Sequence, residues 1–248
     1  MTKTLKPSTE STTTDASALT VFPTQHKVLD HGYAALVETW GSDSRVIEAA
    51  RMSTDGSFRG WDTDQRLLRY LWEHKHHTPF EMGGMVVEVQ APIFVAREWF
   101  RHRTQSFNEL SGRYSTLPDL FYYPSIERLM TGKQSQKNHQ GSEGGFSKVE
   151  AINIRQDIIE ATTAARGVYE SLLSKGVSRE LARLVVPVNQ FTRFRASANL
   201  RNWLAFLALR LDEGAQWEIR QFATALGTIV SEKFPRTWEL FREENVKA

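Results

Sequence analysis

The chain has 248 residues, of which 40% are hydrophobic and 24% are charged, and its formal net charge is +2. This length and composition are typical of a globular protein with one large domain or two small ones, and the small net charge argues against a protein that coats nucleic acid. The absence of cysteine excludes disulfides, thiolate metal ligands and cysteine nucleophiles.

Residues 1–25 are rich in serine and threonine. They hold too few apolar groups to offset the entropy of ordering, which predicts a disordered N-terminal tail. The segment lacks the continuous apolar core of a signal peptide, and no apolar run in the chain approaches the roughly 20 residues needed to cross a bilayer. We therefore expect a cytoplasmic protein without membrane contact, in which residues 26–248 form the folded part.

The first half of the folded part alternates between helical and extended patterns. Leu67, Leu68 and Leu71 share one helical face, and Met85, Val87 and Val89 share one side of a strand. In chain order we predict helices over residues 43–51 and 63–76, a half-buried strand over 84–91, a helix over 93–103 that Pro92 introduces, and turns with short extended pieces over 104–125.

The second half begins with a polar, glycine-containing segment, residues 131–147, which predicts a mobile loop. A long helix over residues 149–174 follows, whose core candidates are Ile154, Ile158, Ala161, Ala165, Val168 and Leu172. We then predict a short helix from Ser178 that ends before Pro187, an extended segment over 190–198, and helices over 200–212 and 215–234. No internal repeat or linker is evident, so we expect a single α+β domain with a mixed or antiparallel sheet packed against several helices.

The most unusual stretch is residues 101–115, which holds three arginines, a histidine and a carboxylate within fifteen residues. Arginine provides planar forks for phosphate oxygens. The Ser111 hydroxyl and the backbone N–H of Gly112 offer further donors. A glycine also lets the backbone approach a ligand closely. Glu109 can orient an arginine or accept from a ribose hydroxyl. The segment therefore favours an anionic ligand with several hydrogen-bonding groups.

Three other interpretations are weaker. His74, His76, His77 and His102 could indicate a metal hydrolase, but no His-Glu-x-x-His pattern accompanies them. Residues 101–113 could form a nucleic-acid-binding module, which normally requires a broader basic surface with stacking aromatic residues. A dinucleotide-binding dehydrogenase is disfavoured because the Gly-x-Gly-x-x-Gly fingerprint is absent. We expect neither a metal site nor a nucleic-acid partner.

The Arg101-His102-Arg103 triplet, followed by seven residues and then Ser111, resembles the signature motif of the flavin-dependent thymidylate synthases. The resemblance extends through residues 108–114 and 91–97, and it runs from about residue 28 to about residue 238. It implies a homotetramer that binds FAD and methylates dUMP to dTMP. It further implies that methylenetetrahydrofolate donates the carbon and that NADPH reduces the flavin.

The resemblance also implies roles for individual residues. Arg210 is expected to be catalytic, because it would lie near the uracil ring and stabilise negative charge there. The residues expected to bind the cofactor are Ser53, Thr78, Glu81, Arg101, His102, Arg103, Glu109, Asn199 and Arg201. The residues expected to bind the substrate are Glu98, Arg101, Glu109, Leu110, Ser111, Gly112, Arg113, Arg183 and Arg210.

Four positions depart from the family pattern. Met82 and Gly214 stand where some members have histidine, Glu98 where many have glutamine, and Ala205 where some have asparagine. These departures concern individual flavin contacts. Because the chain has no cysteine, it cannot use the thiolate attack of the other class of thymidylate synthase. No activating base stands beside Ser111 in the sequence, so we assign Ser111 to binding and not to nucleophilic attack.

Overall fold

The computed structural model describes residues 22–54, 56–136 and 141–245. In these residues the strands form one antiparallel sheet with the order β1-β2-β3-β5-β4. The α+β class is confirmed, and of the two kinds of sheet expected, the antiparallel one is present. The strands are β1 (Gln25–Val28), β2 (Gly32–Trp40), β3 (Gly84–Pro92), β4 (Ser106–Glu109) and β5 (Phe191–Asn199).

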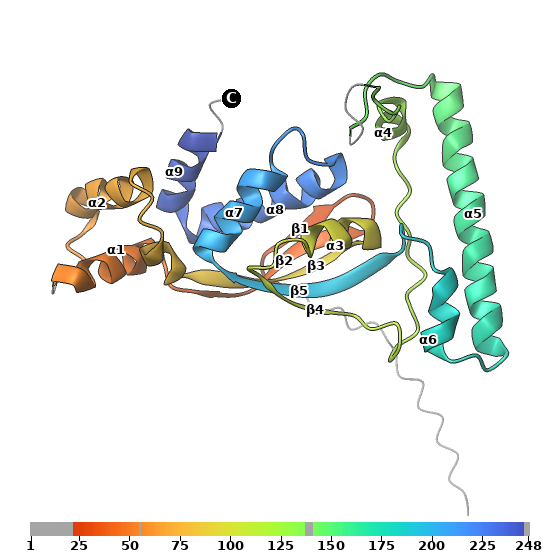
Figure 1. The fold of residues 1–248 in the computed structure, drawn as a ribbon, viewed down its shortest axis with the longest axis horizontal. Coiled ribbons are helices and arrows are strands. Elements are labelled where there is room, and N and C mark those ends of the chain that lie inside the picture. The colour runs from red at the N-terminus through yellow and green to blue at the C-terminus, as the bar shows by residue number, and fades with distance from the viewer. Residues whose placement is uncertain (1–21, 55, 137–140, 246–248) are drawn as a thin grey trace, which may run out of the picture.

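Helices α3, α7 and α8 cover one face of the sheet, with α1, α2 and α9 at one end of the molecule and α5 and α6 at the other (Figure 1). The α-helices are α1 (Asp43–Arg51), α2 (Trp61–Glu73), α3 (Ile93–Trp99), α4 (Ile126–Met130), α5 (Lys148–Ser174), α6 (Arg179–Ala182), α7 (Leu200–Arg210), α8 (Trp217–Lys233) and α9 (Pro235–Asn245). Three 3₁₀ turns, η1 (Met52–Thr54), η2 (Thr78–Glu81) and η3 (Arg183–Val185), complete the described elements. None of the described helices is long and apolar enough to cross a bilayer.

The alternation predicted for β3 is confirmed. Met85, Val87 and Val89 are fully buried in the main core, under the helices. Glu88 points to the opposite face and is nevertheless buried, because its carboxylate accepts from the Tyr33 hydroxyl and from Arg195 Nε. One face of the sheet is therefore an apolar core, and the other carries a polar network.

The N-terminal boundary lies earlier in the chain than the sequence predicted. Phe22 is buried against Tyr33 and Ala35, and Gln25 already begins β1. The pairing of β1 and β2 was not predicted, because the apolar residues of this hairpin follow no simple alternation. The rest of the predicted tail, residues 1–21, lies outside the described residues, and the tail remains an expectation there.

The long helix is confirmed as α5, but its predicted core face is partly wrong. Val168 is 48% exposed, and the buried side chains are instead Ala151, Thr162 and Tyr169. The physical reason is that α5 stands apart from the sheet and packs against α4, α6 and η3 (Figure 1). Its periodicity therefore shows that a helix forms without showing which of its sides meets the core.

The segment before α5 contains one short helix, α4, that the sequence did not predict. Within the predicted loop 131–147, the described residues show an isolated bridge between Gln134 and Ser142. Residues 137–140 lie outside the described residues, and the mobility of the loop remains an expectation. Ser147 and Glu150 form a reciprocal capping box that begins α5.

Helix α2 ends at Glu73, three residues earlier than predicted, because the chain enters a left-handed turn. Lys75 has φ +57°, a conformation that costs a non-glycine residue roughly 1–2 kcal/mol. The His76 N–H donates to the Leu71 carbonyl at 2.9 Å and closes the helix end. Glycine is the usual residue at such a position, so a lysine at this helix end is unusual.

The last helix, α9, was not predicted, and a buried carboxylate fastens it to α1. Asp43 accepts from the backbone N–H of Arg236 at 2.8 Å, from that of Thr237 at 3.2 Å, and from the Thr237 hydroxyl at 2.6 Å. These N–H groups lie in the first helical turn, where no intrahelical acceptor is available. Arg69 of α2 also donates twice to Glu243, at 2.6 and 3.0 Å. Helix α9 is thus held against both α1 and α2.

Substituting Asp43 by alanine is expected to destabilise the protein by about 1–3 kcal/mol, because buried donors of α9 lose their acceptor. Asp43→Asn keeps one acceptor oxygen and is expected to lose less. Urea denaturation followed by tryptophan fluorescence measures both free energies of unfolding. An alanine variant as stable as the wild type would show that the contact does not hold α9.

Candidate active site

The arginine-histidine-arginine triplet at residues 101–103 lies in a turn and not in a helix. Helix α3 ends at Trp99, and the N–H groups of Arg101 and His102 donate to the carbonyls of Glu98 and Trp99 at 3.3 and 3.0 Å. The fully buried Trp99 donates from Nε1 to Gln105 Oε1 at 2.9 Å, which fixes both ends of the turn. The predicted helix over residues 93–103 was therefore too long, and the turn lets His102 fold back toward α7.

A cluster of three side chains joins this turn to the end of α7. Arg210 donates from Nε to His102 Nε2 at 2.9 Å and from Nη1 to Glu98 Oε1. The Arg210 side chain is only 18% exposed. Glu98 Oε2 is buried and has no hydrogen-bond partner among the described residues. The cluster thus holds the guanidinium on two sides and leaves its Nη2 group without a partner among the described residues.

The surroundings determine the protonation of His102, which the sequence left open. Burial, followed by the nearby charge of Arg210, lowers the pKa of His102 to about 4, and the ring packs edge-on against Phe206 at 4.7 Å between centroids. An Nε2 that accepts from Arg210 belongs to a neutral imidazole with its proton on Nδ1. Burial raises the pKa of Glu98, although the charge of Arg210 and its hydrogen bond oppose this effect.

A second cluster lies in the segment after β4. Ser111 Oγ accepts from the Arg113 N–H at 3.2 Å, and Arg113 Nη2 lies 3.3 Å from Glu180 Oε2. A Cβ atom at Gly112 would lie 3.4 Å from Arg183 Cδ, so that arginine passes close to the glycine. The structure thus brings together Ser111, Gly112, Arg113 and Arg183, as an anion site requires. No described carboxylate or imidazole hydrogen-bonds to the Ser111 hydroxyl.

A third group of predicted residues surrounds a cavity of about 780 Å³ at the α1–α2 end, which we call the flavin-side cavity. Ser53, Thr78 and Arg201 line it, together with Met82. Arg201 also pairs with Glu81 of η2. Asn199 plays a structural part, because its side chain accepts from the Asn202 N–H at 3.0 Å and caps α7.

Glu109 and Leu110 occupy the strand edge between these groups. Glu109 Oε1 accepts from the Thr192 hydroxyl at 2.6 Å, and the Leu110 N–H donates to the Arg193 carbonyl at 2.8 Å. Both line a cavity of about 280 Å³ over β4 and β5. Arg101 and Arg103 are exposed, so their guanidinium groups are open to a ligand.

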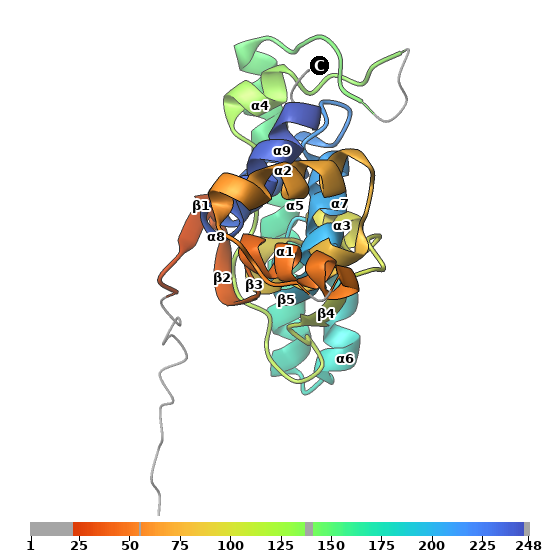
Figure 2. The same cartoon turned by 90° about the vertical axis from the view of Figure 1, so that its left-hand side faces the viewer.

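The three groups do not form one cleft within a single chain. The Ser111–Arg183 cluster belongs to the α6 end, whereas the flavin-side cavity belongs to the α1–α2 end. Figure 1 shows these ends at opposite sides of the molecule, and Figure 2 looks at it from the α1–α2 side. The Glu98–His102–Arg210 cluster lies between them. A ligand that needs all three groups therefore needs more than one copy of the chain.

The metal interpretation finds no support in the described residues, which contain no group of histidine, aspartate and glutamate suited to hold a metal ion. His74 and His76 pack around Tyr70, with ring centroids 4.0 and 5.7 Å from it. Sequence reasoning missed one feature, a smaller cavity beside the flavin-side cavity with Lys75 at its rim. The signal that could have indicated it is a lysine at a helix end where glycine is usual.

The low pKa of His102 predicts a stability that falls in mild acid. The folded protein favours neutral His102, so this residue contributes stability that is fully present above pH 6.5 and is lost as the pH falls toward about 4. His102→Gln keeps an acceptor for Arg210 but cannot be protonated, and is expected to lose less stability over this range. Denaturation at several pH values, with NMR titration of the imidazole, measures the effect. A His102 that titrates near pH 6.5 would contradict it.

Comparisons with known proteins show the family of the chain. The sequence profile of the family described as "Thymidylate synthase complementing protein" matches residues 35–236. A flavin-dependent thymidylate synthase of Thermus thermophilus is 45% identical over 216 residues, which cover 87% of this chain and 77% of that protein. The enzyme of the same name from Thermotoga neapolitana is 41% identical over 214 residues, which cover 86% and 92%.

Among solved structures, the UMP/dUMP methylase PolB of Streptomyces cacaoi, bound with 5-Br UMP, superposes with a TM-score of 0.79 and 33% identity. The superposition covers 88% of this chain and 97% of that one. The profile match spans most of the chain, and the identity to the curated relatives is high over most of its length. The chain therefore belongs to the flavin-dependent thymidylate synthase family.

Proposed function

We propose that this chain converts dUMP to dTMP, with methylenetetrahydrofolate as the carbon donor and with FAD, reduced by NADPH, as the hydride source. The observation that carries the proposal is the Glu98–His102–Arg210 cluster, in a chain that shares the family signature. In the overall reaction the methylene carbon leaves the folate nitrogens and bonds to C5 of the uracil ring, C5 loses its proton, and a hydride reduces the methylene to a methyl group while tetrahydrofolate is released. The flavin supplies the hydride when bound.

Arg210 is suited to stabilise charge on the uracil ring. Two acceptors, Glu98 and His102, already fix its guanidinium, so it needs little reorganisation when charge develops on a bound ring. Its remaining N–H groups can donate to a ring carbonyl. Neutral His102 allows this geometry, because a protonated imidazole would repel the guanidinium.

The Ser111–Arg183 cluster is suited to the nucleotide phosphate. Arg113 is now paired with Glu180, but both side chains are more than half exposed. A pair of this kind contributes little to stability, so a phosphate group can replace Glu180 at small cost. The Ser111 hydroxyl and the amides around Gly112 add neutral donors. In this assignment Ser111 binds the substrate and does not attack it.

The flavin-side cavity supports FAD binding. Its volume of about 780 Å³ is within the range of small-molecule sites, roughly 300–1,000 Å³. Ser53 and Thr78 offer hydroxyl donors, and Arg201, with the exposed Arg101 and Arg103, offers cations for the pyrophosphate.

The substrate is proposed to be dUMP, and methylation of UMP is the second candidate. PolB, named as a UMP/dUMP methylase, is similar in structure at 33% identity. The curated thymidylate synthases are more similar in sequence, up to 45%, which favours the deoxynucleotide. The cytoplasmic location expected from the sequence remains a prediction.

The active unit is proposed to be a homotetramer. Large apolar side chains are exposed beside the phosphate-binding arginines, with Tyr114 80%, Leu184 77% and Leu181 57% exposed. Apolar patches of this kind indicate a surface that another chain covers. The separation of the three groups within one chain supports the same conclusion, because a neighbouring copy can bring the missing group.

The proposed reaction is tested with flavin-loaded protein, dUMP, methylenetetrahydrofolate and NADPH. NADPH should bleach the flavin absorption, dTMP should form, and UMP should react more slowly. Arg210→Ala should lower the rate at saturating substrate by about a hundred- to a thousand-fold, the typical effect of losing a donor that stabilises transition-state charge.

Ser111→Ala serves as the matched variant for binding. The loss of one neutral hydrogen bond should raise the dUMP concentration required by about two- to twelve-fold and leave turnover measurable. Folded, flavin-loaded wild-type protein that forms no dTMP would refute the proposed function. A Ser111→Ala variant that binds dUMP normally but never turns over would instead assign Ser111 to nucleophilic attack.

The shared site is tested by mixing two inactive variants, Arg183→Ala and Arg210→Ala. If one chain provides Arg183 and another provides Arg210, hybrids that assemble from freely exchanging copies should regain roughly a quarter of the wild-type rate. The mass of the assembly in solution gives the number of copies. If subunit exchange is demonstrated and the hybrids stay inactive, then a single chain provides both arginines of each site.

A further inference from the structure

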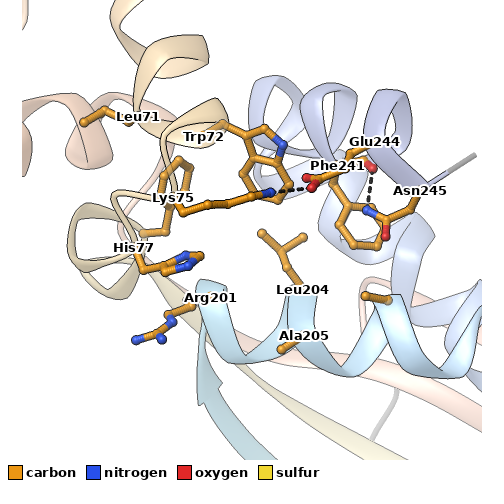
Figure 3. Close-up of a pocket in the computed structure, with 12 residues that line it drawn as sticks. Leu71, Trp72, Lys75, His77, Arg201, Leu204, Ala205, Phe241, Glu244 and Asn245 are labelled. Atoms are coloured by element: carbon orange, nitrogen blue, oxygen red, sulfur yellow. Dashed lines mark hydrogen bonds and ion pairs between the residues drawn. The ribbon is translucent and has the colours of Figure 1, made fainter. Parts of the chain in front are cut away.

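A cavity of about 360 Å³ lies between α2, α7 and α9, and we call it the α9 cavity. It shares Leu71, Lys75, His77 and Arg201 with the flavin-side cavity, so the two spaces adjoin. The close-up shows Trp72 and Phe241 along one side and Leu204 and Ala205 on α7 along another (Figure 3). Arg201 and Ala205, which line it, stand at positions expected to contact the flavin, and the expected roles give no purpose to its other lining residues.

Lys75 is the unusual feature of its rim. Lys75 adopts φ +57°, a backbone conformation that glycine adopts more easily. The backbone therefore does not favour lysine at this position, which draws attention to the contacts of its side chain. Its Nζ pairs with Glu244 of α9 and lies 5.7 Å from the centroid of the Trp72 ring. The carboxylate of Glu244 thus occupies a position where a cation and an aromatic face meet, at the edge of the cavity (Figure 3).

The walls and the rim differ in chemistry. Trp72 packs edge-on against Phe80 and Phe241, with centroids 5.6 and 6.4 Å apart, and Leu204 adds an aliphatic wall. Lys75 and Arg201 stand at the rim as exposed cations, with about half of each side chain accessible. The cavity therefore suits a ligand with an apolar planar ring and a carboxylate at one end.

We propose that the α9 cavity binds the p-aminobenzoyl-glutamate end of the folate donor, with the ring against Trp72 and Phe241 and a glutamate carboxylate replacing Glu244 on Lys75. That this ligand is part of a folate rests on the proposed function. The neighbouring flavin-side cavity makes the place suitable, because the donor must reach the reaction from a site nearby. An adenine ring fits less well, since its several polar atoms would face apolar walls without partners.

The inference is tested with full-length, flavin-loaded protein and p-aminobenzoyl-glutamate itself, by calorimetry. Lys75→Gly removes the cation but keeps the backbone conformation, so it should fold, and it should weaken binding by roughly three- to ten-fold. Glu244→Gln removes the competing carboxylate and should tighten binding by about two- to five-fold. Lys175→Gly, at the end of α5, is the matched control and should leave the affinity unchanged.

Steady-state kinetics provides the second readout. Lys75→Gly should raise KM for methylenetetrahydrofolate and leave KM for dUMP unchanged. The inference is overturned if the wild-type protein does not bind p-aminobenzoyl-glutamate, or if neither variant changes its affinity. It is also overturned if AMP binds more tightly and responds to Lys75→Gly, because the cavity then takes the adenylate end of a dinucleotide.

These outcomes separate the inference from the proposed function. Formation of dTMP by a protein that does not bind p-aminobenzoyl-glutamate refutes the inference and leaves the function standing. Binding of the probe that depends on Lys75, in a protein that forms no dTMP, supports the site and refutes the function.

Discussion

The pairing of β3 with β5 is the constraint on which the site depends. The two strands pair antiparallel over their full nine residues, Gly84 opposite Asn199 and Pro92 opposite Phe191. Helix α3 follows β3 directly and α7 follows β5 directly, so the two helices start at opposite ends of the same ladder. A nine-residue strand spans about 30 Å, whereas α3 and α7 rise about 10 and 16 Å. Two helices that run back over the sheet therefore end close together, which brings Glu98 and His102 to Arg210.

The electrostatics of that meeting point follow from burial. A guanidinium that is mostly removed from water needs acceptors, and Arg210 has one carboxylate and one imidazole. Burial, and after it the positive charge of Arg210, lowers the pKa of His102 and keeps the ring neutral. The burial that holds the arginine between its two acceptors thus also determines the protonation of the histidine beside it. Glu98 supplies the carboxylate that pairs with this guanidinium.

The two ends of the molecule complement this centre in different ways. At the α6 end, arginines and exposed apolar side chains occupy the same surface, as expected where a neighbouring copy both covers the surface and shares its ligand. At the α1–α2 end, the contacts are made within one chain. Asp43 of α1 and Arg69 of α2 hydrogen-bond to α9 and hold it beside the flavin-side cavity. The ionic contact between Lys75 and Glu244 is exposed and weak by comparison, which suits a contact that a ligand displaces.

The amino-acid sequence alone determined most of the regular elements and the chemical character of the site. The alternation at residues 85–89 and the helical face that Leu67, Leu68 and Leu71 share in α2 are local patterns that reflect which side of each element is buried. The Arg-His-Arg signature identified the family because its residues are contiguous. The sequence could not determine which side of α5 meets the core. Val168 and Tyr169 are both apolar enough to be buried, and only the positions of α4 and α6 decide which of them is. Nor could it show that His102 accepts from Arg210, 108 residues away in the chain, or that Lys75 meets Glu244. Contacts between distant residues depend on strand register and helix length together, and only the tertiary structure combines the two.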